Sequence, residues 1–265
     1  MIASRGWLNL FGIEPMALTL RDYQHSKKQR LLAEIPPRDL CYACWRPVGF
    51  CYCAKIRPVE TELRFAILIH PIEEKRPIAT GRMAHLCLKD SLLIEGDDYS
   101  EAAAVNRLLD DPVYHPVVLY PGPHSIDLTP LTPAARRELF PKGKKPLVFV
   151  IDGTWNSARR TLNRSFNLQK LPQIRFTPPT PSRIVVRHQP EKHYFTTIEA
   201  IHHVIDLFAA PGASKGASED ASKDASARPH DNLLEVLDYM VGLQLPFFWQ
   251  GKRRDEGPRK RRHPL

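Results

Sequence analysis

The stretch Leu147-Val148-Phe149-Val150-Ile151-Asp152-Gly153-Thr154-Trp155 decides what kind of fold the chain can adopt. Five consecutive apolar residues, introduced by Pro146, predict a strand that is buried on both faces, as in a parallel sheet covered by helices. Ligands of open α/β sheets bind at the carboxyl ends of such strands, so Asp152 is expected at the mouth of a site. Gly153 would let the backbone turn there, and Trp155 would offer a flat apolar surface.

The segment after this motif is typical of a helix start. Asn156 or Ser157 is expected to cap the helix. Its apolar positions are Ala158, Leu162 and Phe166. A plainer interpretation of the motif stays open at this point, in which the carboxylate only ends the strand and the tryptophan belongs to the core.

Length and composition are those of a soluble globular chain with one main domain. The chain has 265 residues, of which 43% are hydrophobic and 25% charged, and these values are ordinary for folded proteins. No apolar run approaches the roughly 20 residues that span a bilayer, and the N-terminus fits no secretory signal. We expect a cytoplasmic location, no membrane contact and no obligate protein partner, whether translation begins at Met1 or at Met16.

Basic residues are concentrated near the C-terminus. The formal net charge is +9, and residues 252–262 hold seven basic and two acidic side chains. A second basic group, at residues 21–30, lies in an N-terminal arm expected over residues 1–37. Such blocks are usually solvated extensions, and the sharper hypothesis is a phosphate-binding tail over residues 246–265 with a polyanion as its partner.

Four of the five cysteines lie in one short segment, residues 38–62. They have the spacing C-x2-C, six residues, C-x-C, and they are Cys41, Cys44, Cys51 and Cys53. Disulfides are disfavoured in the cytoplasm, whereas four thiolates on two turns can surround one tetrahedral Zn²⁺. Four protein ligands close such a site, so this zinc is expected to be structural. Unrelated free cysteines are the alternative, and the isolated Cys87 is expected in the core.

Strands and helices are expected to alternate along residues 63–245. The predicted strands are 63–69, 117–120, 174–176 and 184–186, and the predicted helices include one after Thr80 and one over 232–243. The inner face of the first of these helices would carry Met83, Leu86, Cys87 and Leu93. This alternation predicts an α/β fold with a mostly parallel sheet, interrupted by a flexible Ala/Ser/Gly loop at 211–229.

The segment Thr196-Thr197-Ile198-Glu199 fits a capping box at the start of another helix. The apolar positions of this helix share one face, and they are Ile198, Ile201, Ile205 and Phe208. His202 and His203 also lie in it. No metal-ligand spacing surrounds them, so they are expected on the helix surface and not as ligands.

Unusual residues stand at the predicted strand ends and helix starts. After the cysteines they follow in the order His70-Pro71-x-Glu73, Tyr120-Pro121-Gly122, Asp152-Gly153-Thr154-Trp155, Ser182-Arg183 and Thr197-x-Glu199-Ala200. Neither G-x-G-x-x-G nor G-x-x-x-x-G-K-[ST] is present, which disfavours ordinary dinucleotide and nucleoside triphosphate sites. The combination resembles the DTW-domain family over residues 38–245, with the catalytic domain over residues 63–245.

This resemblance implies both a fold and an activity. DTW-domain proteins are tRNA-uridine aminocarboxypropyltransferases, related in fold to the knotted α/β (SPOUT-related) methyltransferases. They use S-adenosylmethionine as donor of the 3-amino-3-carboxypropyl group and form acp3U in tRNA. The insertion at 211–229 and the basic tail depart from the compact family pattern.

The resemblance also implies roles for single residues. Asp152 would be the catalytic or substrate-orienting carboxylate. The S-adenosylmethionine site would include Tyr120, Pro121, Gly122, Thr154, Trp155, Phe195, Thr196, Thr197 and Glu199. The substrate contacts would be His70, Glu73, Arg82 and Arg183, and for Arg183 the choice between the cofactor carboxylate and RNA stays open.

Two other functions compete with this one. An RNA methyltransferase of the same fold group would use the same cofactor for methyl transfer. A zinc-containing RNA-binding module without catalysis would need only the cysteines and the basic arms. The carboxylate at the end of the buried strand argues against such a module, because phosphate binding does not require it.

Overall fold

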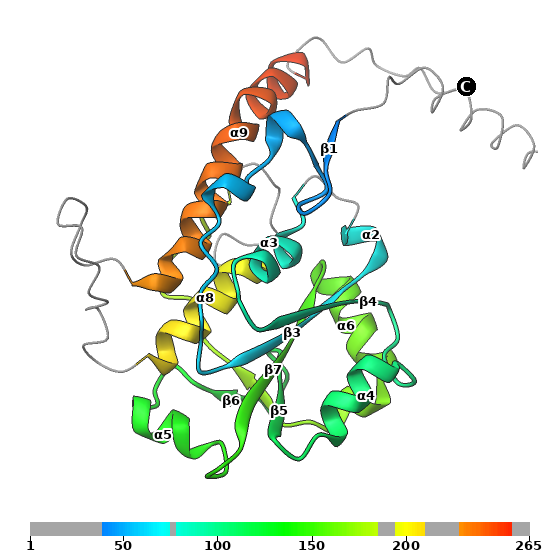
Figure 1. Ribbon diagram of the computed structural model, residues 1–265, viewed down its shortest axis with the longest axis vertical. Helices are drawn as coiled ribbons and strands as arrows, with labels where there is room; N and C mark the ends of the chain where they lie inside the picture. Colours follow the sequence, from blue (N-terminus) through cyan, green and yellow to red (C-terminus); the bar gives the residue numbers. More distant parts are fainter. Residues whose placement is uncertain (1–38, 75–77, 185–193, 210–227, 256–265) are drawn as a thin grey trace, which may run out of the picture. The chain divides into compact units, whose positions relative to one another are not determined.

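The computed structural model describes residues 39–74, 78–184, 194–209 and 228–255. The chain divides into two compact units, Met1–Leu40 and Cys41–Leu265, and the second carries the fold. Its centre is a sheet of six strands in which every pairing is parallel (Figure 1). In spatial order the strands are β4 (Ser91–Glu95), β3 (Arg64–Ile69), β7 (Lys145–Asp152), β5 (Tyr114–Leu119), β8 (Gln173–Arg175) and β6 (Ile126–Asp127).

The two long apolar strands, β3 and β7, lie side by side and are buried on both faces, as their sequences predict. Alternate side chains of a strand point to opposite faces. Leu147 and Phe149 of β7 therefore enter one hydrophobic cluster and Val148 and Val150 enter the other. The α/β class and the parallel sheet are confirmed.

Helices cover both faces of the sheet (Figure 1). One face packs against α3 (Thr80–Leu86), α8 (Thr197–Phe208) and α9 (Asn232–Asp255). The other packs against α4 (Ala103–Asp110), α6 (Trp155–Arg164) and α7 (Phe166–Gln169). Within the described residues, no helix is both long enough and apolar enough to cross a membrane.

Shorter elements complete the fold. The cysteine segment contains the strands β1 (Leu40–Cys41) and β2 (Arg46–Pro47) and the 3₁₀ turns η1 (Val48–Phe50) and η2 (Cys53–Lys55). Helix α2 (Pro71–Glu74) follows β3, α5 (Pro133–Glu138) lies against α8, and the 3₁₀ turn η3 (Pro229–Asp231) leads into α9.

The segment after Thr80 differs from the expectation. Helix α3 ends at Leu86, Cys87 is its fully buried C-terminal cap, and Leu93 lies in β4 and not on the helix. The polar pair Lys89-Asp90 separates the two elements. An apolar run as short as 92–94 fits a strand or a helix equally well by its pattern alone, which is why the helix was predicted too long.

Several predictions lie partly or wholly outside the described residues. These are the N-terminal arm, the loop at 211–229, most of the strand at 184–186 and the end of the basic tail. The helix predicted over 232–243 is present and continues to Asp255, so it extends past Leu245, where the main domain was expected to end.

Candidate active site

Asp152 is the last residue of β7, and its carboxylate is buried between the first residues of two helices. The Thr197 hydroxyl at the start of α8 donates a hydrogen bond to Oδ1, and the Thr80 hydroxyl at the start of α3 lies 3.5 Å from the same oxygen. A Cβ on Gly81 would lie 2.6 Å from Oδ2. Helix N-termini favour negative charge, so this position suits a carboxylate. Thr80 and Gly81 were not predicted as site residues.

The register of the sheet brings other predicted residues to the same edge. Ile69 of β3 pairs with Asp152, and the His70 amide, one residue later, donates to the Asp152 carbonyl at 3.4 Å. Glu73 is buried one turn further on, and its amide donates to the His70 carbonyl at 2.8 Å. On the opposite side of β7, Leu119 pairs with Val150, so the Tyr120 turn begins at this edge too.

The turn at Tyr120-Pro121-Gly122 is held by its own backbone. The Gly122 amide donates to the Tyr120 carbonyl at 2.9 Å and to the Ser125 hydroxyl at 2.7 Å. A Cβ on Gly122 would lie 2.2 Å from Oε1 of Gln173 on β8. A larger residue at position 122 would therefore require the end of the Gln173 side chain to move.

The predicted capping box at the start of α8 is confirmed. Glu199 is buried, and Oε2 accepts from the Thr196 amide at 2.8 Å and from the Ser182 hydroxyl at 2.8 Å. Its Oε1 accepts from the Arg183 amide at 2.6 Å. With both oxygens engaged by the chain, Glu199 acts here as a positioning residue that ties the 182–183 segment to the helix that carries Thr197.

The helix after Asp152 begins two or three residues earlier than expected. Thr154 is the N-cap of α6, and its hydroxyl accepts from the Ser157 amide at 3.2 Å. The predicted caps, Asn156 and Ser157, are therefore wrong as caps. A cap by Ser157 was plausible because serine and threonine hydroxyls both accept amide hydrogen bonds, and the pattern alone does not fix the starting turn. Phe166 likewise belongs to α7 and not to this helix.

The aromatic residues near these helix starts are partly exposed. Trp155 is 40% exposed, which excludes a place in the core, and its ring lies 5.0 Å from the Tyr194 ring, measured between centroids. Phe195 packs near Phe176 and His203, with ring centroids 5.9 and 6.0 Å away. The chain therefore presents an aromatic surface just after the carboxylate.

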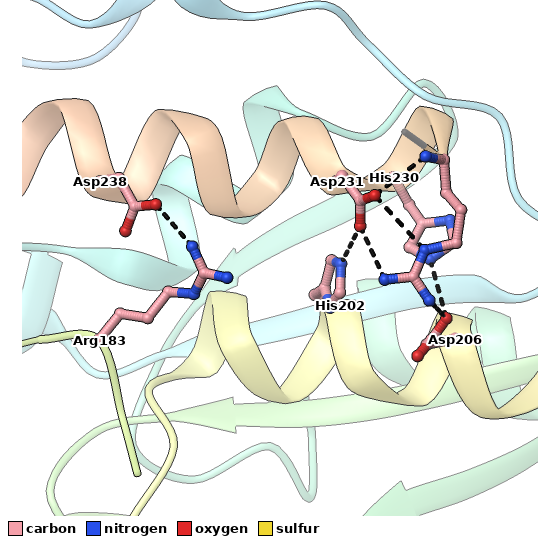
Figure 2. Close-up of polar contacts among 7 residues, drawn as sticks. Arg183, His202, Asp206, His230, Asp231 and Asp238 are labelled. Carbon is pink, nitrogen blue, oxygen red and sulfur yellow. Dashed lines mark hydrogen bonds and ion pairs between the residues drawn. The ribbon is translucent and has the colours of Figure 1, made fainter. Parts of the chain in front are cut away.

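Both arginines predicted to bind substrate already contact other side chains. The Arg183 guanidinium donates to Asp238 of α9 at 2.6 Å in a half-exposed ion pair (Figure 2). The Arg82 guanidinium lies 5.0 Å from the centroid of the Trp45 ring, which connects α3 with the cysteine segment. Because the Arg183 pair is exposed to solvent, it is worth little energy, and an anionic ligand can compete for it.

The four clustered cysteines form a group that could hold a metal ion. Their sulfurs all lie within 4.8 Å of one another, and the Cys41–Cys53 and Cys44–Cys51 separations are both 3.7 Å. These separations exclude disulfides, and they agree with the ~3.8 Å expected between thiolates at about 2.3 Å from a tetrahedral ion. Backbone hydrogen bonds from Cys44 and Ala43 lower the pKa of the Cys41 thiol to about 6.

A second polar cluster, between α8 and α9, was not predicted. His202 is buried, and its Nε2 lies 2.8 Å from Oδ1 of Asp231 (Figure 2). Arg228 pairs with both Asp231 and Asp206. The expectation that His202 lies on the helix surface is wrong, because the last helix, distant in sequence, covers this face of α8. No local spacing could signal the contact.

Comparisons with known proteins found one family and several similar sequences. A family model described as the DTW domain matches residues 38–245. The Drosophila melanogaster protein named tRNA-uridine aminocarboxypropyltransferase 2 is 31% identical over 173 residues, which cover 62% of this chain and 65% of the relative. The Mus musculus protein of the same name is 28% identical over 174 residues, 61% of this chain and 54% of the relative. The chain thus spans less than two thirds of the length of either relative, and no solved structure matches it.

Proposed function

Because this chain belongs to the DTW-domain family, we propose that it transfers the 3-amino-3-carboxypropyl group of S-adenosylmethionine to N3 of a uridine in tRNA, forming acp3U. The observation that carries the proposal is the similarity to relatives named for this activity. The buried carboxylate at the edge of the sheet supports it, since a module that only bound RNA would not need that group.

S-adenosylmethionine, when bound, supplies an electrophilic methylene next to its sulfonium. Uridine N3 forms a bond to that carbon, the carbon–sulfur bond breaks, and methylthioadenosine leaves with the electron pair. Asp152 accepts or orients the N3 proton, as general-base logic requires. The hydroxyls of Thr197 and Thr80 fix the orientation of this carboxylate. Positioning of the two substrates supplies much of the remaining rate enhancement.

The residues proposed to hold S-adenosylmethionine come from strand ends and helix starts. They are Tyr120, Pro121, Gly122, Thr154, Trp155, Phe195, Thr196 and Thr197, with Glu199 acting through the start of α8. The 40% exposure of Trp155 supports an apolar contact with the cofactor. The position of the Tyr120 turn at the same edge of the sheet as Asp152 supports its place in the site. His70, Glu73, Arg82 and Arg183 are the proposed substrate contacts.

Three further properties belong to the same proposal. The metal at the four cysteines is Zn²⁺ in a structural role, which the all-thiolate donor set favours. The location is cytoplasmic, which the free thiols support. The sheet belongs to the knotted methyltransferase class, in agreement with the late strand β7 lying between β3 and β5.

Incubation of the purified protein with S-adenosylmethionine and bulk tRNA tests the proposal, with an incubation without tRNA as control. Release of methylthioadenosine that depends on tRNA is the expected result. Release of S-adenosylhomocysteine would make the protein a methyltransferase, and release of neither product would leave only RNA binding.

A further inference from the structure

The cysteine segment exposes an unusual amount of apolar and aromatic surface. Tyr42 is 92% exposed, Trp45 is 56% exposed and Val48 is 60% exposed, and we call these three residues the knuckle face. Scattered exposed apolar residues need no explanation, but several on one short segment mark an interaction site. From Cys41 to Pro58 the sequence also has three basic residues and no acidic one.

The backbone at Trp45 indicates that its side chain serves a purpose. Its φ is +57°, and it is the one non-glycine residue with positive φ in the described part of the chain. Its amide donates to the Cys41 carbonyl at 2.8 Å, so Trp45 closes the turn that carries the first two cysteines. Glycine or asparagine suits such a position, and a bulky aromatic residue there is an outlier. Strained residues of this kind gather at functional sites.

The knuckle face is joined to the candidate active site through α3. The Arg82 guanidinium lies over the Trp45 ring at 5.0 Å. The two residues before it, Thr80 and Gly81, are the ones that meet the Asp152 carboxylate. A molecule bound on Trp45 therefore contacts a residue of the helix that also carries two of the residues that meet the proposed base.

We propose that the knuckle face docks tRNA by stacking Tyr42 and Trp45 on unpaired nucleobases next to the modified uridine. This inference rests on the proposed function and names the surface that its RNA substrate uses. Proteins read single-stranded RNA with exposed aromatic rings and arginine planes. The knuckle face places such rings beside Arg82, which packs on Trp45, and beside Arg46, the next residue in the sequence, and both are cations that suit phosphates.

A protein partner fits these observations less well. Interfaces between proteins place their aromatic residues in a desolvated centre with a polar rim, whereas Tyr42 and Trp45 stand on a short turn next to cations. Lys55 at the other end of the segment lies 5.3 Å from the centroid of the Tyr239 ring on α9. A cation beside a ring thus occurs twice in contacts of the cysteine segment, which suits a surface that binds nucleic acid.

The test measures the dissociation constants of Tyr42→Ala and Trp45→Asn for a tRNA stem-loop and for a blunt duplex of equal length. Asparagine tolerates the positive φ of residue 45, so this change removes the ring without straining the turn. Trp45→Phe tests rescue by another ring. Phe166→Ala, which removes a ring that is 67% exposed on α7, covering the opposite face of the sheet, is the matched control.

Each loss of a stacking ring should weaken stem-loop binding about 5- to 150-fold. Duplex binding, metal content and the melting temperature should change little, and Trp45→Phe should recover most of the affinity. Unchanged stem-loop affinity in Tyr42→Ala and Trp45→Asn, or equal losses for stem-loop and duplex, would overturn the inference. A wild-type protein that binds the stem-loop but releases no methylthioadenosine overturns the proposed function instead and leaves this result standing.

Discussion

The position of Asp152 fits a catalytic carboxylate and a structural one equally well. Its side chain is buried and accepts hydrogen bonds from residues at the starts of two helices. The two roles predict different behaviour of the Asp152→Asn variant. If the carboxylate accepts the uridine N3 proton, turnover should fall about 10²- to 10⁴-fold, while the affinities for S-adenosylmethionine and tRNA change much less.

Methylthioadenosine release, cofactor affinity and melting temperature should be measured on the same Asp152→Asn preparation. A folded variant with near wild-type turnover would contradict the assignment of Asp152 as a catalytic residue. A lower melting temperature with normal specific activity in the folded fraction would show that Asp152 only joins β7 to the two helices.

Gly81 offers a second test of the same carboxylate. In Gly81→Ala the new Cβ would lie 2.6 Å from Oδ2 of Asp152, so either the carboxylate or α3 must move. We expect a loss of activity of at least tenfold, because small misplacements of catalytic groups are costly. Gly242→Ala is the control, since nothing lies within 4 Å of that Cβ and alanine stabilises a helix interior by roughly 0.5–1 kcal/mol. Equal activities of the two variants would contradict this account.

At the residue scale, the sequence predicted the carboxylate, the cysteines and the capping box, because each has a local pattern. It did not predict that Thr80 and Gly81 meet Asp152. The contact joins residues far apart in the chain, and a single sequence contains no signal for it. The N-cap at Thr154 was missed because Asn156 and Ser157, close to it in the sequence, are also good N-cap residues.

At the element scale, the network between α8 and α9 makes stability depend on pH. Burial lowers the pKa of His202, partly opposed by the hydrogen bond to Asp231, and burial also lowers the pKa of His230. A histidine with a lowered pKa binds fewer protons in the folded state than in the unfolded state. The contribution of such a histidine to the free energy of unfolding is therefore fully present above about pH 6.5, the ordinary histidine pKa. It is lost as the pH falls through the lowered pKa of the folded state.

Urea unfolding at pH 7.5 and at pH 5.5 checks this expectation. The wild-type midpoint should be lower at pH 5.5. In His202→Gln, which keeps a donor for Asp231 but does not titrate in this range, the difference between the two midpoints should shrink. Any acid release of a metal from the cysteines affects both proteins alike. An identical pH dependence in the two proteins would show that His202 is not one of the responsible groups.

Elements with a clear apolar pattern were predicted well, whereas the strands β4 and β6 were not predicted. Strands β3 and β7 and helix α8 follow directly from their apolar patterns. Strand β6 has only two residues and β4 is an edge strand, Ser91–Glu95, of intermediate burial. Short or partly buried strands have too few alternating positions to be distinguished from loops or helix ends.

At the scale of the whole molecule, the sequence predicted the parallel α/β class but not the order of the strands. The strand order rests on contacts between residues far apart in the chain, as does the packing of the long final helix α9 against α3 and α8. Arg57, which belongs to the cysteine segment, pairs with Glu235 of α9, so the segment is attached to the main domain.

Removing the metal should therefore destabilise more than the cysteine segment alone. We expect Cys41→Ser with Cys53→Ser to lose the bound metal and to lower the melting temperature of the whole domain, because metal binding contributes to folding. Elemental analysis and thermal unfolding measure the two effects, and Cys87→Ser separates the effect of metal loss from that of replacing a buried thiol. Retention of metal in the double variant would refute the four-cysteine site.

The all-parallel sheet has a consequence for how the protein is made on the ribosome. Strand β7 pairs on one side with β3 and on the other with β5, so both earlier strands wait for a partner synthesised after them. Until residue 152 has emerged, the edges of β3 and β5 that pair with β7 have no partner. Non-local strand pairing of this kind is slow, and the unpaired edges are prone to aggregation. The four clustered cysteines, by contrast, all precede β3, so the nascent chain can take up a metal ion and fix its first turn before any strand of the six-stranded sheet exists.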